Sequence, residues 1–280
     1  MMYGLLAGGN IGLIYNELRY KDDKANENKE EKQAIYSTQN SELSRISASE
    51  IFAIATAEAI LDFHKGKTSN LTLSVYAEKY KKYFEKYKNE LIHDEQFFKS
   101  GFKNVYDWIN GKNGVSNNAI AVSRSAPIGM YFSKNEIEKQ TRLSCLAGFN
   151  NGNCVIWSNA FCLAILYSKK EGNNLLKAIG DEIDFKPISI NQIKKENRYN
   201  ITAEKVVPVS ISIFLESNSF EDAMQKGIEA GGNSTEILSM VGALAESKFG
   251  IPQKIIDTVK KHLNAELIEV VESFNKIAVR

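Results

Sequence analysis

Two glycines and an asparagine open the stretch of this sequence best suited to hold a ligand, GGNSTEILSMVGALAESKFGIP, from Gly231 to Pro252. Glycine permits the tight turn with positive φ that such an opening requires. Asn233 stands where a helix cap is expected, and apolar residues then recur at helical spacing until Gly250 and Pro252 end the element. A glycine turn that leads into a helix N-terminus can hold a polar or charged group of a ligand.

A second helix with the same kind of start is predicted from Ser47 to Phe63, SASEIFAIATAEAILDF. At both starts a glutamate follows the capping residue three positions later, as Glu50 after Ser47 and Glu236 after Asn233. One interpretation is an acidic pair that holds one metal ion or serves as acid and base. The other is a capping box, in which each glutamate folds back onto the backbone N–H of its own cap. We favour the capping box because it explains the spacing without a ligand.

Several segments in this order resemble the ADP-ribosylglycohydrolase family, to which dinitrogenase-reductase-activating glycohydrolase belongs. The likeness runs from Gly4 to about Ile256. The segments that carry it are GLLAGGNIG from Gly4, SASEIFAIATAE from Ser47, RSAPIG from Arg124, GFNNGN from Gly148, SNSFEDA from Ser217 and the stretch from Gly231.

The sequence departs from the family pattern where that pattern binds metal. In the family, acidic motifs at the two helix starts hold two Mg²⁺ or Mn²⁺ ions, because hard cations need several carboxylate oxygens. The four aspartates of these motifs fall on the neutral residues Ala48, Ser49, Asn233 and Thr235, and two threonines fall on Glu50 and Glu236. A further aspartate and a histidine are replaced by Leu13 and Phe149. We therefore expect no metal at the degenerate positions, which are Ser47, Ala48, Ser49, Asn233, Thr235 and Glu236.

The resemblance implies an all-α fold, a compact orthogonal arrangement of many helices in a single domain over residues 1–280. Family members hydrolyse the N- or O-glycosidic bond between ADP-ribose and a side chain or small molecule. The ligand-binding cleft implied by the resemblance is lined by Ser47, Ser49, Glu50, Arg124, Gly231, Gly232, Asn233, Thr235 and Glu236. In that cleft Arg124 would suit a phosphate, and a structural ion pair is the alternative.

Three functions stay open. The first, which we favour because the departures occur together, is a catalytically silent protein that binds ADP-ribose, an ADP-ribosylated protein or another protein, with no cofactor. The second is a divergent hydrolase that uses Glu50 or Glu236 as acid or base, with Mg²⁺ or Mn²⁺ as its cofactor if it needs one. The third is an immunity or antitoxin partner of an ADP-ribosyltransferase, suggested by the fold and a polar loop from Lys21 to Ser44.

Composition limits the partners. Lys+Arg 35 against Asp+Glu 34 leaves the charge nearly balanced, so neither nucleic acid nor a lipid surface is expected as the main partner. The apolar opening MMYGLLAGGNIGLIY is short, and no apolar span reaches the length of about 18 residues that a membrane anchor needs. The irregularly spaced Cys145, Cys154 and Cys162 predict reduced thiols and a cytoplasmic location. The histidines, expected at helix ends or on polar faces, are His64, His93 and His262.

Apolar periodicity predicts a mainly helical chain. Further helices are expected at Gly4 to Tyr20, Thr72 to about Leu91, Phe97 to Ile109, Asn153 to Tyr167, Asn173 to Asp184, Ser219 to Ala230, Pro252 to Leu263 and Glu266 to Ile277. Pro127 predicts a helix start after an irregular segment. The segment from Thr202 to Glu216 suits helix or strand, and the resemblance favours a helix that starts near Pro208. We expect Lys186 to Tyr199 to be a connector.

Overall fold

The computed structural model describes residues 2–22, 46–91, 117–149, 151–168, 172–180 and 183–278. The regular elements of these residues are helices, which confirms the all-α fold class. In chain order they are α1 (Tyr3–Asp22), α2 (Ala48–His64), α3 (Leu73–Leu91), α5 (Ile120–Ser123), α6 (Ala126–Tyr131), α7 (Lys134–Leu146), α8 (Gly152–Tyr167), α9 (Gly172–Gly180), α10 (Ile190–Glu196), α11 (Ala203–Leu215), α12 (Phe220–Ala230), α13 (Ser234–Phe249), α14 (Gln253–His262) and α15 (Ala265–Ile277). The helix expected at Phe97 to Ile109, His93 and the polar loop beyond Asp22 lie outside the described residues.

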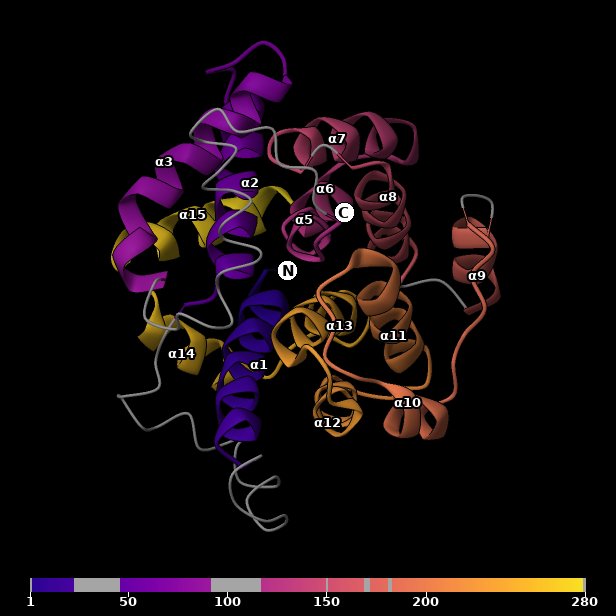
Figure 1. The fold of residues 1–280 in the computed structure, drawn as a ribbon. Helices are drawn as coiled ribbons and strands as arrows, with labels where there is room; N and C mark the ends of the chain where they lie inside the picture. Colours follow the sequence, from indigo (N-terminus) through magenta and orange to yellow (C-terminus); the bar gives the residue numbers. More distant parts are fainter. Residues whose placement is uncertain are drawn as a thin grey trace.

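Helices α1 and α13 lie side by side although they come from opposite ends of the chain (Figure 1). A Cβ atom at Gly8 would lie 1.9 Å from the carbonyl oxygen of Leu238, and one at Gly4 would lie 2.2 Å from that of Gly242. Because these distances leave no room for a side chain, only glycine allows α1 to rest directly on the backbone of α13. The backbone N–H of Gly4 also donates to Oε2 of Glu246 at 2.6 Å.

The two helices that begin with the glutamate-bearing starts are the most enclosed. Every residue of α2 from Ala48 to Ala57 is buried, as is every residue of α13 from Ser234 to Ser247. A helix that is surrounded on all sides belongs to the core of a globular protein. Helices α3 and α15 pack on α2 from one side, and α5 and α6 from another (Figure 1). The starts of α2 and α13 are therefore positioned inside the molecule.

The proline predictions had different outcomes. Pro127 is the second residue of α6, as expected, although the segment before it contains the short helix α5. The prediction that α11 starts near Pro208 is wrong, because α11 begins at Ala203 and Pro208 lies inside it. Because proline has no N–H, the helix lacks one hydrogen bond, to the carbonyl of Glu204 in its first turn. The loss lies near the N-terminal end of the helix, where it is tolerated.

The segment predicted to be a connector, Lys186 to Tyr199, contains α10. Ser189 caps this helix, and its hydroxyl accepts a hydrogen bond from the backbone N–H of Gln192 at 3.3 Å. A cap of this kind satisfies one of the free N–H groups at a helix start, which supports even a helix this short.

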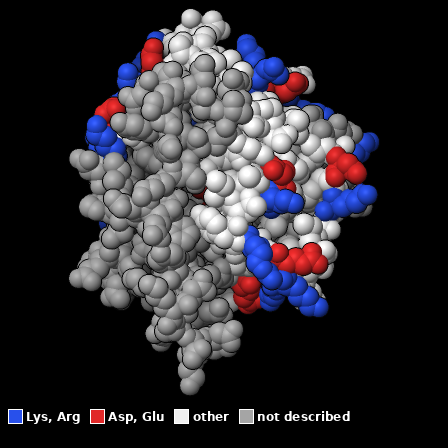
Figure 2. Space-filling model, in the orientation of Figure 1, with Lys and Arg blue, Asp and Glu red and all other residues white. Residues whose placement is uncertain are grey.

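The surface agrees with the balanced composition. On the described part of the face in Figure 2, acidic and basic side chains are interspersed over α7 to α12 rather than gathered by sign. None of the described helices combines the length and apolar character that a membrane crossing requires.

Replacing Gly8 by alanine should separate α1 from α13, because the new methyl group would meet the carbonyl oxygen of Leu238 at 1.9 Å. We expect a loss of about 3 kcal/mol in the free energy of unfolding, measured by urea denaturation. Gly152→Ala is the matched control, since a Cβ atom there has no neighbour within 4 Å. Equal stability of the two variants would contradict the glycine contact.

Candidate functional site

The start of α2 has the capping box that the sequence predicts. The backbone N–H of Ser47 donates to Oε2 of Glu50 at 2.7 Å, and the backbone N–H of Glu50 donates to the hydroxyl of Ser47 at 3.2 Å. Both residues are almost fully buried. The capping box of α7, formed by Ser133 and Glu136, is by contrast exposed to water. Glu50 therefore combines a local structural role with burial of its carboxyl group.

The start of α13 differs from this prediction. Asn233 caps the helix, and its side-chain oxygen accepts from the backbone N–H of Glu236 at 3.5 Å. The carboxyl of Glu236, however, does not return to its own cap. It accepts hydrogen bonds from the hydroxyl of Ser49 and, at 2.7 Å, from the hydroxyl of Ser123. The second capping box is thus wrong, because hydroxyl donors on α2 and α5 hold this carboxyl instead.

Glu236 connects three helices, since Ser49 belongs to α2 and Ser123 to α5. We call Ser47, Ser49, Glu50, Ser123 and Glu236 the carboxyl cluster. The hydrogen bond between Ser49 and Glu236 brings the two predicted helix starts into direct contact. Sequence reasoning missed Ser123, because a serine just before the RSAPIG segment carries no signal of its own.

Helix α1 covers one side of the carboxyl cluster, and Gly9 is the residue in contact with it. A Cβ atom at Gly9 would lie 2.8 Å from Cγ of Glu50 and 2.9 Å from the hydroxyl oxygen of Ser239. That hydroxyl is buried and has no hydrogen-bond partner among the residues that the structure describes. Leu13, one turn further along α1, is a buried apolar side chain. The α1 side of the cluster therefore supplies space and apolar surface rather than a ligand oxygen.

Burial changes the acidity of both glutamates. Burial raises the pKa of Glu50 to about 8, and the nearby Glu236 carboxyl contributes in the same direction. The hydrogen bonds from Ser47 lower this pKa but do not offset the effect of burial. Burial also raises the pKa of Glu236, while the hydroxyls of Ser49 and Ser123 lower it. Because a pKa of about 8 lies above neutral pH, Glu50 mostly keeps its proton there. Both carboxyl groups therefore hold their protons to a higher pH than an exposed glutamate does.

The turn before α13 has the backbone expected from the two glycines, with φ of 69° at Gly231 and 71° at Gly232. Asn197 packs against this turn, and its side-chain amide donates to the carbonyls of Ala230 and Gly231, each at 3.1 Å. The turn is thus fixed by a residue from the segment after α10.

Arg124, which follows Ser123 in the chain, is fully buried in the core. Its guanidinium carbon is 3.9 Å from the ring centroid of Tyr80 and 4.8 Å from that of Phe149. Its Nη2 donates to the carbonyl of Ser144 at 2.5 Å and to that of Ala147 at 3.4 Å. No carboxylate of the described residues forms an ion pair with it. The structure therefore places Arg124 between aromatic rings, without an ion pair among the described residues, and its role in a ligand cleft stays a prediction.

The predicted cleft residues are mostly enclosed. Only Gly231 and Gly232 are half-buried, whereas the rest are buried, namely Ser47, Ser49, Glu50, Arg124, Asn233, Thr235 and Glu236. A ligand would reach the carboxyl cluster only after some displacement of its neighbours.

The residues at the degenerate positions do not fit a two-metal centre. Ala48 has no side-chain oxygen, Ser49 already donates to Glu236, and the side-chain oxygen of Asn233 accepts from a backbone N–H. Across the part of the chain that the structure describes, no group of three or more His, Cys, Asp or Glu side chains could hold a metal ion. Two carboxyl groups, one of which keeps its proton at neutral pH, supply too little negative charge for two hard divalent cations.

The remaining candidates are structural. His64 ends α2, where Nδ1 lies 3.0 Å from the hydroxyl of Tyr131, and the half-buried His262 ends α14 with its pKa lowered by burial. The three cysteines are free and buried. Burial raises the pKa of Cys154 and of Cys162 to about 12, so both are poor nucleophiles at neutral pH.

Comparison with known proteins gives one family and one fold. The model of the ADP-ribosylglycohydrolase family matches residues 1–278. A solved structure described as an ADP-ribosylglycohydrolase-related protein complex is similar to this chain with a TM-score of 0.61 at 10% identity, over 84% of this chain and 83% of that one. At this identity the structural likeness concerns the fold alone. Among curated proteins, none matches the sequence.

Glu50→Gln should change how stability depends on pH. The unfolded chain releases the Glu50 proton near its ordinary pKa of 4.5, whereas the folded chain holds it up to about 8. The stabilisation from this proton is therefore complete below pH 4.5 and lost as pH rises toward 8. The glutamine variant should show a shallower decline over this window, by up to about 1.4 kcal/mol per pH unit, in urea titrations at several pH values.

Glu136→Gln is the control for this measurement, because it alters the exposed capping box of α7. If the two variants flatten the pH dependence equally, burial of Glu50 is not the cause.

Ser123→Ala should leave Oε2 of Glu236 without its hydroxyl donor. We expect a cost of about 1–3 kcal/mol in unfolding free energy, since a buried carboxyl loses a hydrogen bond. Ser168→Ala removes an equally buried hydroxyl that donates to a carbonyl within its own turn, at 2.8 Å, and should cost about 1 kcal/mol or less. A larger loss for Ser168→Ala in the same denaturation assay would show that Ser123 does not stabilise the cluster.

Proposed function

Because the chain belongs to the ADP-ribosylglycohydrolase family, we propose that it acts as a binding protein on this scaffold and does not cleave glycosidic bonds with two metal ions. One observation carries the proposal. Where the resemblance implies metal ligands, the side chains bind one another, as the hydroxyls of Ser49 and Ser123 bind the carboxyl of Glu236. A cation that entered this cluster would have to replace hydrogen bonds that its side chains already form with one another.

The ligand in this proposal is ADP-ribose or an ADP-ribosylated protein, which follows from family membership. A cytoplasmic location, suggested by the reduced thiols, belongs to the same proposal. The described residues offer no observation that favours the third interpretation, a partner that blocks an ADP-ribosyltransferase.

Calorimetric titration of the purified protein with Mg²⁺ and Mn²⁺, with and without ADP-ribose, tests the proposal. We expect no metal binding in the micromolar range, and binding of ADP-ribose that EDTA leaves unchanged. An ADP-ribosylated protein added as substrate should release no ADP-ribose. Micromolar metal affinity together with EDTA-sensitive release of ADP-ribose would refute the proposal.

A second candidate function is a divergent hydrolase, favoured by the raised pKa of both Glu50 and Glu236. Enzymes tune carboxyl groups in this direction when they act as general acids near neutral pH. In this case Glu50→Gln and Glu236→Gln should each lower turnover by about 100-fold or more, while Glu136→Gln keeps the wild-type rate. Unchanged turnover in both cluster variants would exclude these residues as acid and base.

A further inference from the structure

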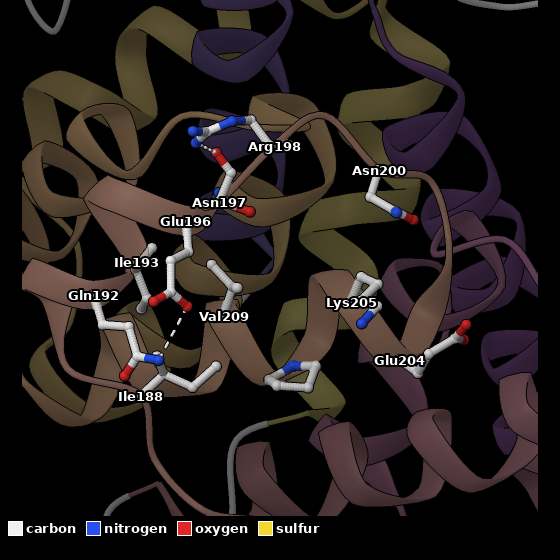
Figure 3. Close-up of a pocket in the computed structure, with 11 residues that line it drawn as sticks. Ile188, Gln192, Ile193, Glu196, Asn197, Arg198, Asn200, Glu204, Lys205 and Val209 are labelled. Carbon is white, nitrogen blue, oxygen red and sulfur yellow. Dashed lines mark hydrogen bonds between the residues drawn. The ribbon is translucent and has the colours of Figure 1, made fainter.

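A pocket of about 450 Å³ opens between α10, the segment that follows it and α11 (Figure 3). No residue of the carboxyl cluster lines it. Part of its wall is apolar, formed by Ile188, Ile193, Pro208 and Val209. The volume falls within the range of sites that bind small molecules.

The carboxylates of this pocket already have partners. Nε2 of Gln192 donates to Glu196 at 3.0 Å, which is drawn as the longer dashed line in Figure 3. The side-chain amide of Asn117 donates to Glu204, whose carboxylate points away from the other labelled side chains (Figure 3). The acidic groups are therefore partly satisfied within the protein.

The cations of the pocket retain free donors. Lys205 is exposed, and its side-chain ammonium forms no hydrogen bond or ion pair with another described residue. Arg198 uses only Nη1, which donates to the carbonyls of Lys195 and Asn197 at 2.9 and 3.1 Å. Its Nη2 and Nε form no hydrogen bond with a described residue, so an anionic ligand can replace the water that these exposed donors contact.

Pro208 adds an acceptor to the same wall. Because proline has no N–H, the carbonyl oxygen of Glu204, four residues earlier, lacks its helical donor. Both residues line the pocket. A hydroxyl group of a ligand can supply the missing hydrogen bond.

We propose that this pocket binds a small molecule with an anionic group on a hydroxylated body, such as a sugar phosphate or a sugar acid. The anionic group pairs with Lys205 or with Arg198, whose charged ends lie apart in Figure 3. A hydroxyl donates to the carbonyl of Glu204, and the carbon skeleton packs on Ile188 and Pro208. The site is separate from the carboxyl cluster, so it goes beyond the function proposed above.

Calorimetry with ribose 5-phosphate, gluconate and uncharged ribose tests the ligand class. At least one of the two anionic probes should bind, and ribose should bind about tenfold or more weakly, because it cannot pair with Lys205 or Arg198. The comparison of the phosphate with the carboxylate identifies which anionic group the site prefers. Failure of both anionic probes to bind, or equal binding of ribose, would overturn the proposal.

Variants then test the location. At least one of Lys205→Gln and Arg198→Gln should weaken the bound anionic probe about tenfold. Lys195→Gln is the matched control, because it removes an exposed charge on α10 from a side chain that does not line the pocket. Wild-type affinity in both pocket variants would refute the site. Glu50→Gln should keep full affinity, which separates this result from any outcome at the carboxyl cluster.

Discussion

A carboxyl group removed from water must keep its proton or find hydrogen-bond donors, and Glu236 finds them where α2, α5 and α13 meet. Its donors, Ser49 and Ser123, lie on different helices. The same two bonds therefore satisfy the carboxyl and fix the starts of α2 and α13 against α5. A break in either bond would leave a buried carboxyl oxygen without its donor, so the junction behaves as a unit. The contact of α1 with α13 completes the enclosure, because Gly9 leaves room for Glu50 and Ser239.

The closed carboxyl cluster and a two-metal centre need different amounts of negative charge. Hard cations require concentrated negative charge, whereas a closed cluster without cations is more stable when it approaches neutrality. Glu50 lowers the negative charge of the cluster by keeping its proton, and the neutral Ala48 and Asn233 add no negative charge. The replacements along the two helix starts thus fit together as one electrostatic change. This is the physical basis for proposing a binding role on the family scaffold.

Sequence patterns predict the helices well because burial imposes a regular spacing of apolar residues, and they locate both helix starts. They predict the contacts of Glu50, which are local, but fail for Glu236, whose partners are distant in the chain. The surroundings of Arg124 are equally hard to predict, since the rings beside it come from α3 and the segment after α7. Pro208 shows the limit of a local rule, because a proline favours helix starts yet is tolerated further inside a helix.

The glycine contact between α1 and α13 also bears on how the chain acquires its structure. Gly4 and Glu246 are hydrogen-bonded across a separation of 242 residues. Such pairing at long range raises the contact order and slows folding. During synthesis α1 must wait, with its apolar surface uncovered, until α13 has emerged from the ribosome. A nascent chain of this kind is a natural client for chaperones that shield early apolar segments.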